Sequence, residues 1–322
     1  MILLISVLVV SGCKTTQTET EEKIVTIGIA GWGSNPEFMR NIEGFKDGLA
    51  ENGYVEGENV QFIVEIPETD LDVQREIIQS FIDADVDLIF SITTPGTLVA
   101  KEMTNEIPIV FSVNTFPVES GVIDSLESSG NNIVGTRNYV PVARQYSACE
   151  KIYQDTNTLA FVHRKGEPNS VAQYLEMKGF LKRKEINIID IAAVDLSDMR
   201  QQLESNIDSV DTIFSACDTL THSLGGEELI VEFSKKHKKP SFACNKEGTI
   251  RGHLMGNIAD FYVIGKISGR QAALILRGAK PSSLLTESPA EDYLIINTKT
   301  AADLGINIPQ YVLDDAEEII ND

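Results

Sequence analysis

A group of hydroxyl side chains directly follows a short apolar run in the first half of the chain. Residues 88–92 read Leu-Ile-Phe-Ser-Ile, typical of a buried strand, and Thr93-Thr94-Pro95-Gly96 comes next. Proline suits the first turn of a helix, so we expect a helix over 97–104. The hydroxyls of Thr93 and Thr94 and the free N–H groups of this turn would then lie at the carboxyl end of a strand. Helix amino ends at such positions favour anions such as a carboxylate.

The second half of the chain contains a stretch of the same kind. Residues 211–216 have the composition of another buried strand, which stops at Cys217-Asp218-Thr219. Both stretches place polar side chains where a buried strand ends. We therefore interpret the rest of the chain as the framework that brings two such strand ends to face each other.

Alternating strands and helices position both stretches. Apolar runs that look like strands alternate with amphipathic helical patterns from Lys23 to about Thr136, and a second series of the same order begins near Pro141. This alternation predicts βαβ units and parallel sheets. At 322 residues the chain is long enough for two cores. We predict an α/β protein with two doubly wound parallel-sheet domains, joined by a hinge, whose strand ends face one cleft.

Catalytic motifs are not found in the sequence. The four histidines lie outside any nucleophile or metal motif, and there is no G-x-S-x-G, H-E-x-x-H or P-loop. The carboxylate pairs Asp70 with Asp72 and Glu227 with Glu228 are interpreted as solvated helix surface. The sequence therefore predicts a protein that is not an enzyme and needs no cofactor.

The four cysteines, Cys13, Cys149, Cys217 and Cys244, have no C-x-x-C spacing. A zinc or iron–sulfur site is therefore not expected, and no metal is assigned. The three cysteines after Cys13 are interpreted as buried and inert, with at least one thiol free or paired between chains.

The charge balance excludes one class of partner. The chain has 27 basic and 48 acidic residues and a formal net charge of −21. A nucleic-acid partner needs a basic face, so none is expected. The lysine-rich segment 235–239 is interpreted as a solvated helix end, where cations are favourable.

The amino terminus has the pattern of an export signal. Residues 2–10 are almost wholly apolar, too short to span a bilayer but of the length of a signal-peptide core. Val10-Ser-Gly-Cys13 resembles a bacterial lipobox, which predicts lipidation of Cys13. We assign residues 1–12 to a signal peptide and 13–23 to a polar, lipidated tether; the alternative is a buried amino-terminal strand. An exported protein, anchored to the membrane only by lipid, is expected.

Several short segments together resemble a known family. They are Gly44-Phe-Lys-Asp-Gly-Leu49, Gly53-Tyr-Val-Glu-Gly-Glu-Asn-Val60, Thr94-Pro95, Ile107-Pro-Ile-Val-Phe-Ser112, Asn131-Asn-Ile-Val-Gly135, Glu167-Pro-Asn-Ser170 and Asn297-Thr-Lys-Thr-Ala-Ala-Asp-Leu-Gly-Ile306. In combination they resemble the ABC-transporter substrate-binding lipoproteins of the tryptophan/tyrosine-binding kind, over residues 24 to 309. The resemblance implies the type I periplasmic-binding fold, with a first lobe of 24–138 and 259–285 and a second lobe of 139–258 and 286–322.

The resemblance also implies a ligand pocket built from both lobes. Thr93 and Thr94 would hold a ligand carboxylate, and Asp218 would pair with an ammonium; the alternative for each is a helix cap. Trp32 could stack on a ligand ring. The predicted ligand-binding residues are Trp32, Thr93, Thr94, Asn114, Arg137, Glu167, Asn169, Ser170, Asp218 and Asn245. Phe116 and Thr136-Arg137-Asn138 depart from the usual family pattern, which leaves the ligand open.

The function implied is that of a solute receptor. The two lobes would close on a small ligand, such as an aromatic amino acid, and present it to an ABC permease; we expect a monomer. Two alternatives remain. One is a ligand-sensing domain that signals to a partner protein, and the other is a nucleoside or sugar as ligand on the same fold.

Overall fold

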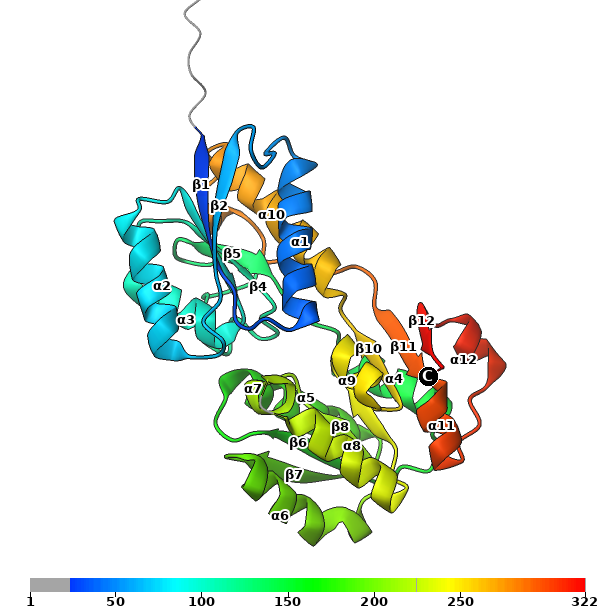
Figure 1. Ribbon diagram of the computed structural model, residues 1–322. Coiled ribbons are helices and arrows are strands. Elements are labelled where there is room, and N and C mark those ends of the chain that lie inside the picture. The colour runs from blue at the N-terminus through cyan, green and yellow to red at the C-terminus, as the bar shows by residue number, and fades with distance from the viewer. Residues whose placement is uncertain (1–23, 224, 322) are drawn as a thin grey trace, which may run out of the picture.

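The computed structural model describes residues 24–223 and 225–321. It contains two α/β lobes, each built on one sheet (Figure 1). The predicted signal peptide, Cys13 and the tether lie outside the described residues. No helix within the described ranges is both long and apolar enough to cross a bilayer.

The first lobe is built on a sheet of five parallel strands in the order β2-β1-β3-β4-β5. Helices cover both faces of it, α1 and α10 on one and α2 and α3 on the other, with one apolar cluster under each face. Its elements are β1 (Val25–Ala30), α1 (Pro36–Ala50), β2 (Val60–Glu65), α2 (Leu71–Asp83), β3 (Leu88–Ile92), α3 (Thr94–Met103), β4 (Ile109–Ser112), β5 (Ile133–Thr136), α10 (Phe261–Leu276) and the 3₁₀ turn η2 (Pro281–Ser283).

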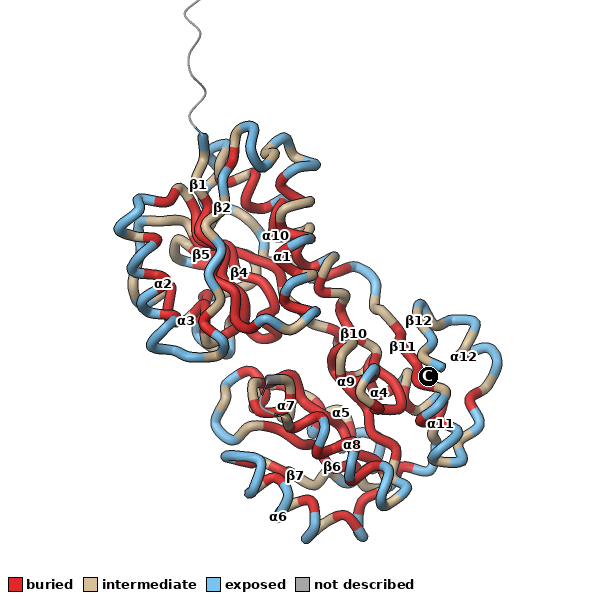
Figure 2. The backbone as a smooth tube through the Cα atoms, viewed as in Figure 1, coloured by how far each residue is buried: buried red, intermediate tan, exposed pale blue. Residues whose placement is uncertain are grey.

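The second lobe is built on seven strands in the order β12-β11-β10-β9-β8-β6-β7. Its elements are α4 (Val142–Ile152), β6 (Thr158–Arg164), α5 (Pro168–Arg183), β7 (Asn187–Ala193), α6 (Leu196–Asn206), η1 (Ile207–Ser209), β8 (Thr212–Ser215), α7 (Thr219–Ser223), α8 (Gly226–His237), β9 (Ser241–Ala243), α9 (Lys246–Arg251), β10 (Met255–Ile258), β11 (Tyr293–Asn297), α11 (Thr298–Leu304), α12 (Gln310–Asp314) and β12 (Glu318–Ile320). Its buried apolar residues form two clusters, one with Leu159 and Phe161 and the other with Ala160 and Val162, from alternate positions of β6. Figure 2 shows where buried residues lie along the chain in both lobes.

The predicted pair of doubly wound α/β domains is confirmed, with one difference. Strand β11 runs antiparallel to β10, because the chain reaches β11 from the first lobe and not through a helical crossover. Within the described residues the chain passes between the lobes three times, at 137–141, at 259–260 and at 288–292. The exact lobe limits stay a prediction.

A close contact of two helices holds the returning segment α10 to α1. A Cβ added to Gly265 would lie 2.1 Å from the Asn41 carbonyl oxygen, and one added to Gly269 would lie 2.2 Å from that of Phe45. Gly44 and Gly48 face α10 equally closely. Small residues at these four positions allow the backbones to touch, which fixes the returning helix on the first lobe.

Candidate functional site

The strand order of each lobe marks one place at its sheet edge where ligands bind in open α/β sheets. In the first lobe the order 2-1-3-4-5 reverses between β1 and β3, and in the second the equivalent reversal lies between β6 and β8. Trp32 follows β1 and Thr93 follows β3, whereas Glu167 follows β6 and Asp218 follows β8. These four predicted site residues therefore come from the two reversal points, whereas Asn114, Arg137 and Asn245 follow other strands.

A cavity lies between the lobes at these strand ends. It is lined by Trp32, Phe38, Thr93, Thr94, Pro95, Val113, Thr115, Asn138, Glu167, Asn169, Cys217, Asp218, Thr219 and His222. Its volume is about 40 Å³, enough for very few water molecules. A neighbouring cavity of about 410 Å³ shares the wall formed by Trp32, Thr94, Pro95, Glu167 and Thr219. A ligand as large as an amino acid therefore needs the lobes or this wall to move apart.

Thr93 forms the first-lobe wall in a strained backbone conformation. Its φ of 71° and ψ of 162° lie in a region that is almost restricted to glycine. It stands at the N-cap position of α3, yet its side chain makes no capping hydrogen bond, and its buried Oγ1 has no partner among the described residues. The Thr93 side chain therefore does not cap α3, which was the alternative interpretation of this residue. Helix α3 begins at Thr94, three residues before the predicted start, with Pro95 in its first turn.

Two more residues of this wall have an unpaired donor or a strained backbone. The indole Nε1 of Trp32 is buried without a partner among the described residues, although its ring lines both cavities. Val113, at the end of β4, is a second β-branched residue with positive φ, 55°. Strained residues and unpaired donors concentrate where a ligand is bound, because the ligand supplies the missing interactions.

Asp218 forms the second-lobe wall and accepts several hydrogen bonds. Its Oδ1 accepts from the backbone N–H groups of Leu220 (3.0 Å) and Thr221 (2.9 Å), and its Oδ2 accepts from that of Arg164 (2.7 Å). It therefore caps α7, as the alternative interpretation holds, and also lines the cavity. Burial raises the pKa of this carboxyl.

Glu167 lies beside Asp218 and has a strongly perturbed acidity. The pKa of Glu167 is raised to about 7, mainly by burial and then by the charge of the neighbouring Asp218. Hydrogen bonds from Thr219 oppose this rise. The Thr219 hydroxyl donates to Glu167 Oε2 at 2.7 Å. Of the described residues that line the cavity, none is a lysine or an arginine. The second-lobe wall thus offers carboxyl groups that would gain from a cationic ligand group.

Asn169 connects the two lobes across the cleft. Its Oδ1 accepts from the backbone N–H of Phe116 in the first lobe at 3.0 Å, and its Nδ2 donates to the Cys217 carbonyl in the second lobe at 2.7 Å. The side chain is buried and uses its polar atoms on protein partners. Asn169 therefore lines the cavity as a contact between the lobes.

Four of the predicted site residues do not line this cavity. Arg137 donates from Nε to the Thr115 carbonyl (2.9 Å) and lies over the Tyr139 ring, in a different pocket. Ser170 is fully buried and bonds to carbonyls of its own lobe. Asn245 caps α9, and Asn114 is buried with both amide atoms unpaired among the described residues. Strand-end position does not determine where a side chain points, and the role of these four residues in ligand binding stays a prediction.

Several lining residues were not predicted as site residues. Thr115, Asn138 and Thr219 lie one position beyond predicted residues, so a wider window at each strand end would have included them. Phe38 and His222 come from helices, and no local signal in the sequence distinguishes them from core or surface positions.

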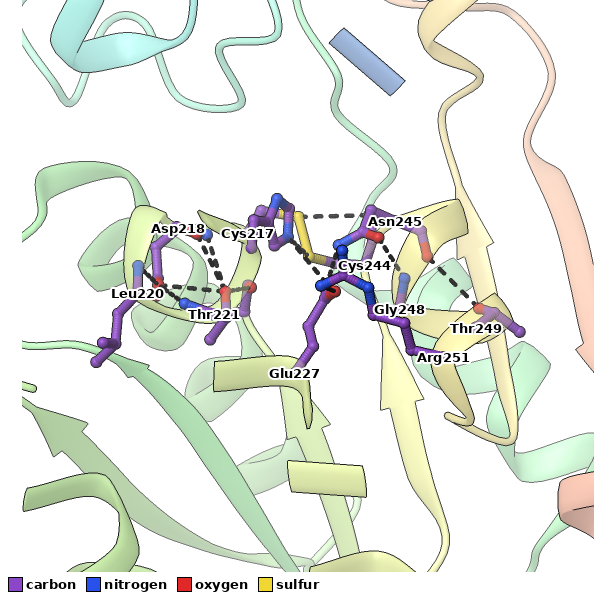
Figure 3. A network of polar contacts seen from close by, with 12 residues as sticks. Cys217, Asp218, Leu220, Thr221, Glu227, Cys244, Asn245, Gly248, Thr249 and Arg251 are labelled. Atoms are coloured by element: carbon purple, nitrogen blue, oxygen red, sulfur yellow. Dashed lines mark hydrogen bonds and ion pairs between the residues drawn. A yellow bond between two sulfur atoms is a disulfide. The ribbon is translucent and has the colours of Figure 1, made fainter. Parts of the chain in front are cut away.

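Two features of the second-lobe wall go beyond the sequence interpretation (Figure 3). Cys217 and Cys244 form a disulfide with Cα atoms 5.7 Å apart, a pairing that the sequence left open; Cys149 is the free cysteine among the described residues, and it is buried. Glu227 was interpreted as solvated but is 1% exposed, and burial raises its pKa to about 8. Its carboxylate contacts Asn245 Nδ2 and lies 3.4 Å from Arg251 Nη1. Adjacent strands bring these distant residues together.

Two hinged α/β lobes that enclose a polar cavity at their strand ends define a ligand receptor of the periplasmic-binding type. The sequence model of the family described as "ABC transporter substrate binding protein" matches residues 26–320, and the chain belongs to this family. It is a substrate-binding protein of an ABC transporter, which acts outside the cytoplasm, and the family is one of solute receptors, not enzymes. The predicted function class is confirmed.

Individual proteins are similar to this chain in sequence and fold. A "Tyrosine-binding protein" from Clostridioides difficile is 24% identical over 279 residues, which cover 87% of this chain and 80% of the relative. A conserved domain protein from Vibrio cholerae is 26% identical, with a TM-score of 0.85 over 92% of this chain and 100% of that one. An ABC domain from Streptococcus pneumonia, solved in complex with L-Trp, is 24% identical with a TM-score of 0.85, over 92% of this chain and 99% of that one.

Proposed function

We propose that this substrate-binding protein takes up an aromatic amino acid in the interlobe cavity and delivers it to an ABC permease. The observation that carries the proposal is the opposition of two walls. The first lobe presents the free Thr93 hydroxyl at the amino end of α3. The second presents Asp218 and Glu167, and no lysine or arginine is among the described residues that line the cavity. A carboxylate suits the first wall and an ammonium the second. The zwitterionic backbone of an amino acid has both groups.

The unpaired indole of Trp32 supports an aromatic side chain on the ligand. It lies at the boundary of the small and the larger cavity, where its ring could stack on that of the ligand. The Clostridioides difficile relative is named for tyrosine binding and the pneumococcal structure contains L-Trp. These names support, for this chain, the same class of ligand.

Calorimetric titration with matched ligands tests the proposal. We expect tyrosine or tryptophan to bind. Tyramine lacks the carboxylate and 3-(4-hydroxyphenyl)propionate lacks the ammonium. Both should bind at least about tenfold more weakly, because hydrogen bonds to charged groups contribute about 1.5–3 kcal/mol. Absence of heat with every amino acid would overturn the assignment.

Substitution of Asp218 identifies the ammonium partner. In Asp218→Asn the difference in affinity between tyrosine and its des-amino analogue should shrink. Changing the Asp218 carboxylate and the ligand ammonium singly and together makes a double-mutant cycle, which isolates the contact between these two groups. Asp195→Asn is the matched control, because Asp195 also caps a helix, α6, and lines neither cavity. An equal change in both variants would mean that Asp218 acts only as a cap.

We also propose that the mature protein begins at a lipidated Cys13 and is held at the membrane by this anchor. The apolar run 2–10 and the Val-Ser-Gly-Cys sequence support it. Metabolic labelling with a fatty acid should label the wild-type chain and not Cys13→Ala. Label retained in the variant would contradict the anchor.

A further inference from the structure

The disulfide of the second lobe belongs to a larger cluster of possible metal ligands. Cys217 follows β8, Cys244 follows β9, and His222 lies on α7. One ligand atom of each lies within 4.8 Å of the others, and His222 Nε2 is 3.0 Å from Cys244 Sγ. Two sulfurs and an imidazole nitrogen form the donor set that zinc and related ions prefer.

We propose that the dithiol form of this protein binds a thiophilic metal ion of the Zn²⁺ class through Cys217, His222 and Cys244. The disulfide form described above has no thiolates to offer, so the site exists only after reduction. This inference is independent of the proposed amino-acid ligand. It assigns a second, redox-dependent binding site to the same lobe.

The dimensions of the cluster suit such an ion. In a tetrahedral zinc site with bonds of about 2.0–2.3 Å, ligand atoms lie about 3.3–3.8 Å apart. Opening of the disulfide lets the two sulfurs separate to this distance. The ligand atoms of all three residues already lie within 4.8 Å of one another, so the third ligand needs only a small movement. Both cysteines stand at the ends of neighbouring parallel strands, which hold them in place.

A buried carboxylate beside the cluster provides charge compensation. Glu227, 1% exposed, has Oε1 3.9 Å from His222 Nε2. The Arg251 guanidinium lies 3.4 Å from its other oxygen. A divalent ion, two thiolates, one carboxylate and one guanidinium sum to zero charge, so the loaded site buries no net charge. Without an ion, the partners of this carboxylate among the described residues are the Asn245 amide, the Arg251 guanidinium and the His222 ring.

The cluster is accessible to small ions from the cleft. Cys217 and His222 line the interlobe cavity, and His222 and Glu227 line a further cavity beside it. The chemistry balances with an external dithiol or phosphine reductant. The reductant supplies two electrons and is oxidised, the S–S bond breaks, two protons yield two thiols, and the ion then displaces both thiol protons into solvent.

Cobalt titration of the reduced protein tests the proposal. The folded chain is reduced with a phosphine, freed of reductant without oxygen, and titrated with Co²⁺ and then Zn²⁺. We expect a thiolate-to-cobalt charge-transfer band that saturates at one equivalent and is bleached by Zn²⁺. The oxidised protein should show no band.

Variants separate this site from other thiols. Cys149→Ala is the matched control, since it removes a thiol outside the cluster, and it should keep the band. Cys244→Ser should lose it, and His222→Ala, which leaves the disulfide possible, should weaken Zn²⁺ binding at least about tenfold as one of few ligands is lost. The proposal is overturned if the disulfide resists reduction in the folded chain, if no band forms, if it persists in Cys244→Ser, or if His222→Ala binds Zn²⁺ as tightly as the wild type.

Discussion

At the scale of the residue, Thr93 combines strain with an unused hydrogen-bonding group. A β-branched side chain at φ 71° and ψ 162° costs about 1–3 kcal/mol, and its Oγ1 has no partner among the described residues. Neither feature benefits the folded chain alone. Both are explained if the hydroxyl is held ready for a ligand carboxylate beside the amino end of α3.

Thr93→Gly should therefore separate stability from binding. We expect the free energy of unfolding to rise by about 1 kcal/mol, because glycine adopts this conformation without strain. Affinity for the amino acid should fall about tenfold or more with the lost hydroxyl. Denaturant unfolding and calorimetry measure the two quantities. Glu185→Gly, at another positive φ (58°) remote from the cavity, should stabilise without any effect on affinity. A Thr93→Gly protein that is less stable would contradict the strain argument.

At the scale of the element, the amino end of α5 makes contacts both between the lobes and within the second lobe. Asn169 in its first turn bonds to the first-lobe Phe116 N–H and to the Cys217 carbonyl at the end of β8. Its neighbour Ser170 bonds only to carbonyls of the second lobe. One turn of helix thus contains a contact between lobes and a contact within a lobe, at adjacent positions.

Asn169→Ala should favour the open form. Loss of the side chain leaves the first-lobe Phe116 N–H without its present partner, so the closed form loses free energy that the open form does not. The lost contact with the Cys217 carbonyl lies within the second lobe and affects both forms. We expect a larger mean distance between lobes in small-angle scattering and a faster ligand dissociation, with the association rate little changed. Ser170→Ala should alter stability and leave both measurements as in the wild type. An unchanged scattering curve in Asn169→Ala would argue that this contact does not hold the lobes together.

At the scale of the whole molecule, buried carboxyl groups make the stability sensitive to pH. Burial raises the pKa of Glu37 in the first lobe to about 7, with Glu247 and Asp260 adding to the rise and Arg40 and Lys246 opposing it. Glu167 in the second lobe is raised to the same value. An ordinary glutamate has a pKa near 4.3. Between these values the folded chain holds protons that the unfolded chain has lost.

The thermal midpoint should therefore fall as the pH rises from about 4.5 to about 7, because stability decreases with pH wherever the folded state binds more protons. Glu37→Gln has one such buried carboxyl fewer. We therefore expect its thermal midpoint to fall less than that of the wild type over the same pH range. Glu43→Gln, exposed on the same helix, should follow the wild type. Scanning calorimetry between pH 5 and pH 8 measures the difference. Parallel curves for Glu37→Gln and the wild type would show that Glu37 is not buried in its protonated form.

By itself, the sequence determined the class of fold, the family and the two strand ends that face the cleft. Periodicity and turn residues are local, and parallel strands bring their carboxyl ends to one edge, so Thr93 and Asp218 could be placed from the pattern alone. Tertiary structure decided which neighbouring side chains point into the cavity, and it excluded Arg137 and Ser170. It also paired Cys217 with Cys244 and buried Glu227. These outcomes depend on the order of strands and the packing of helices, which contacts distant in the sequence determine.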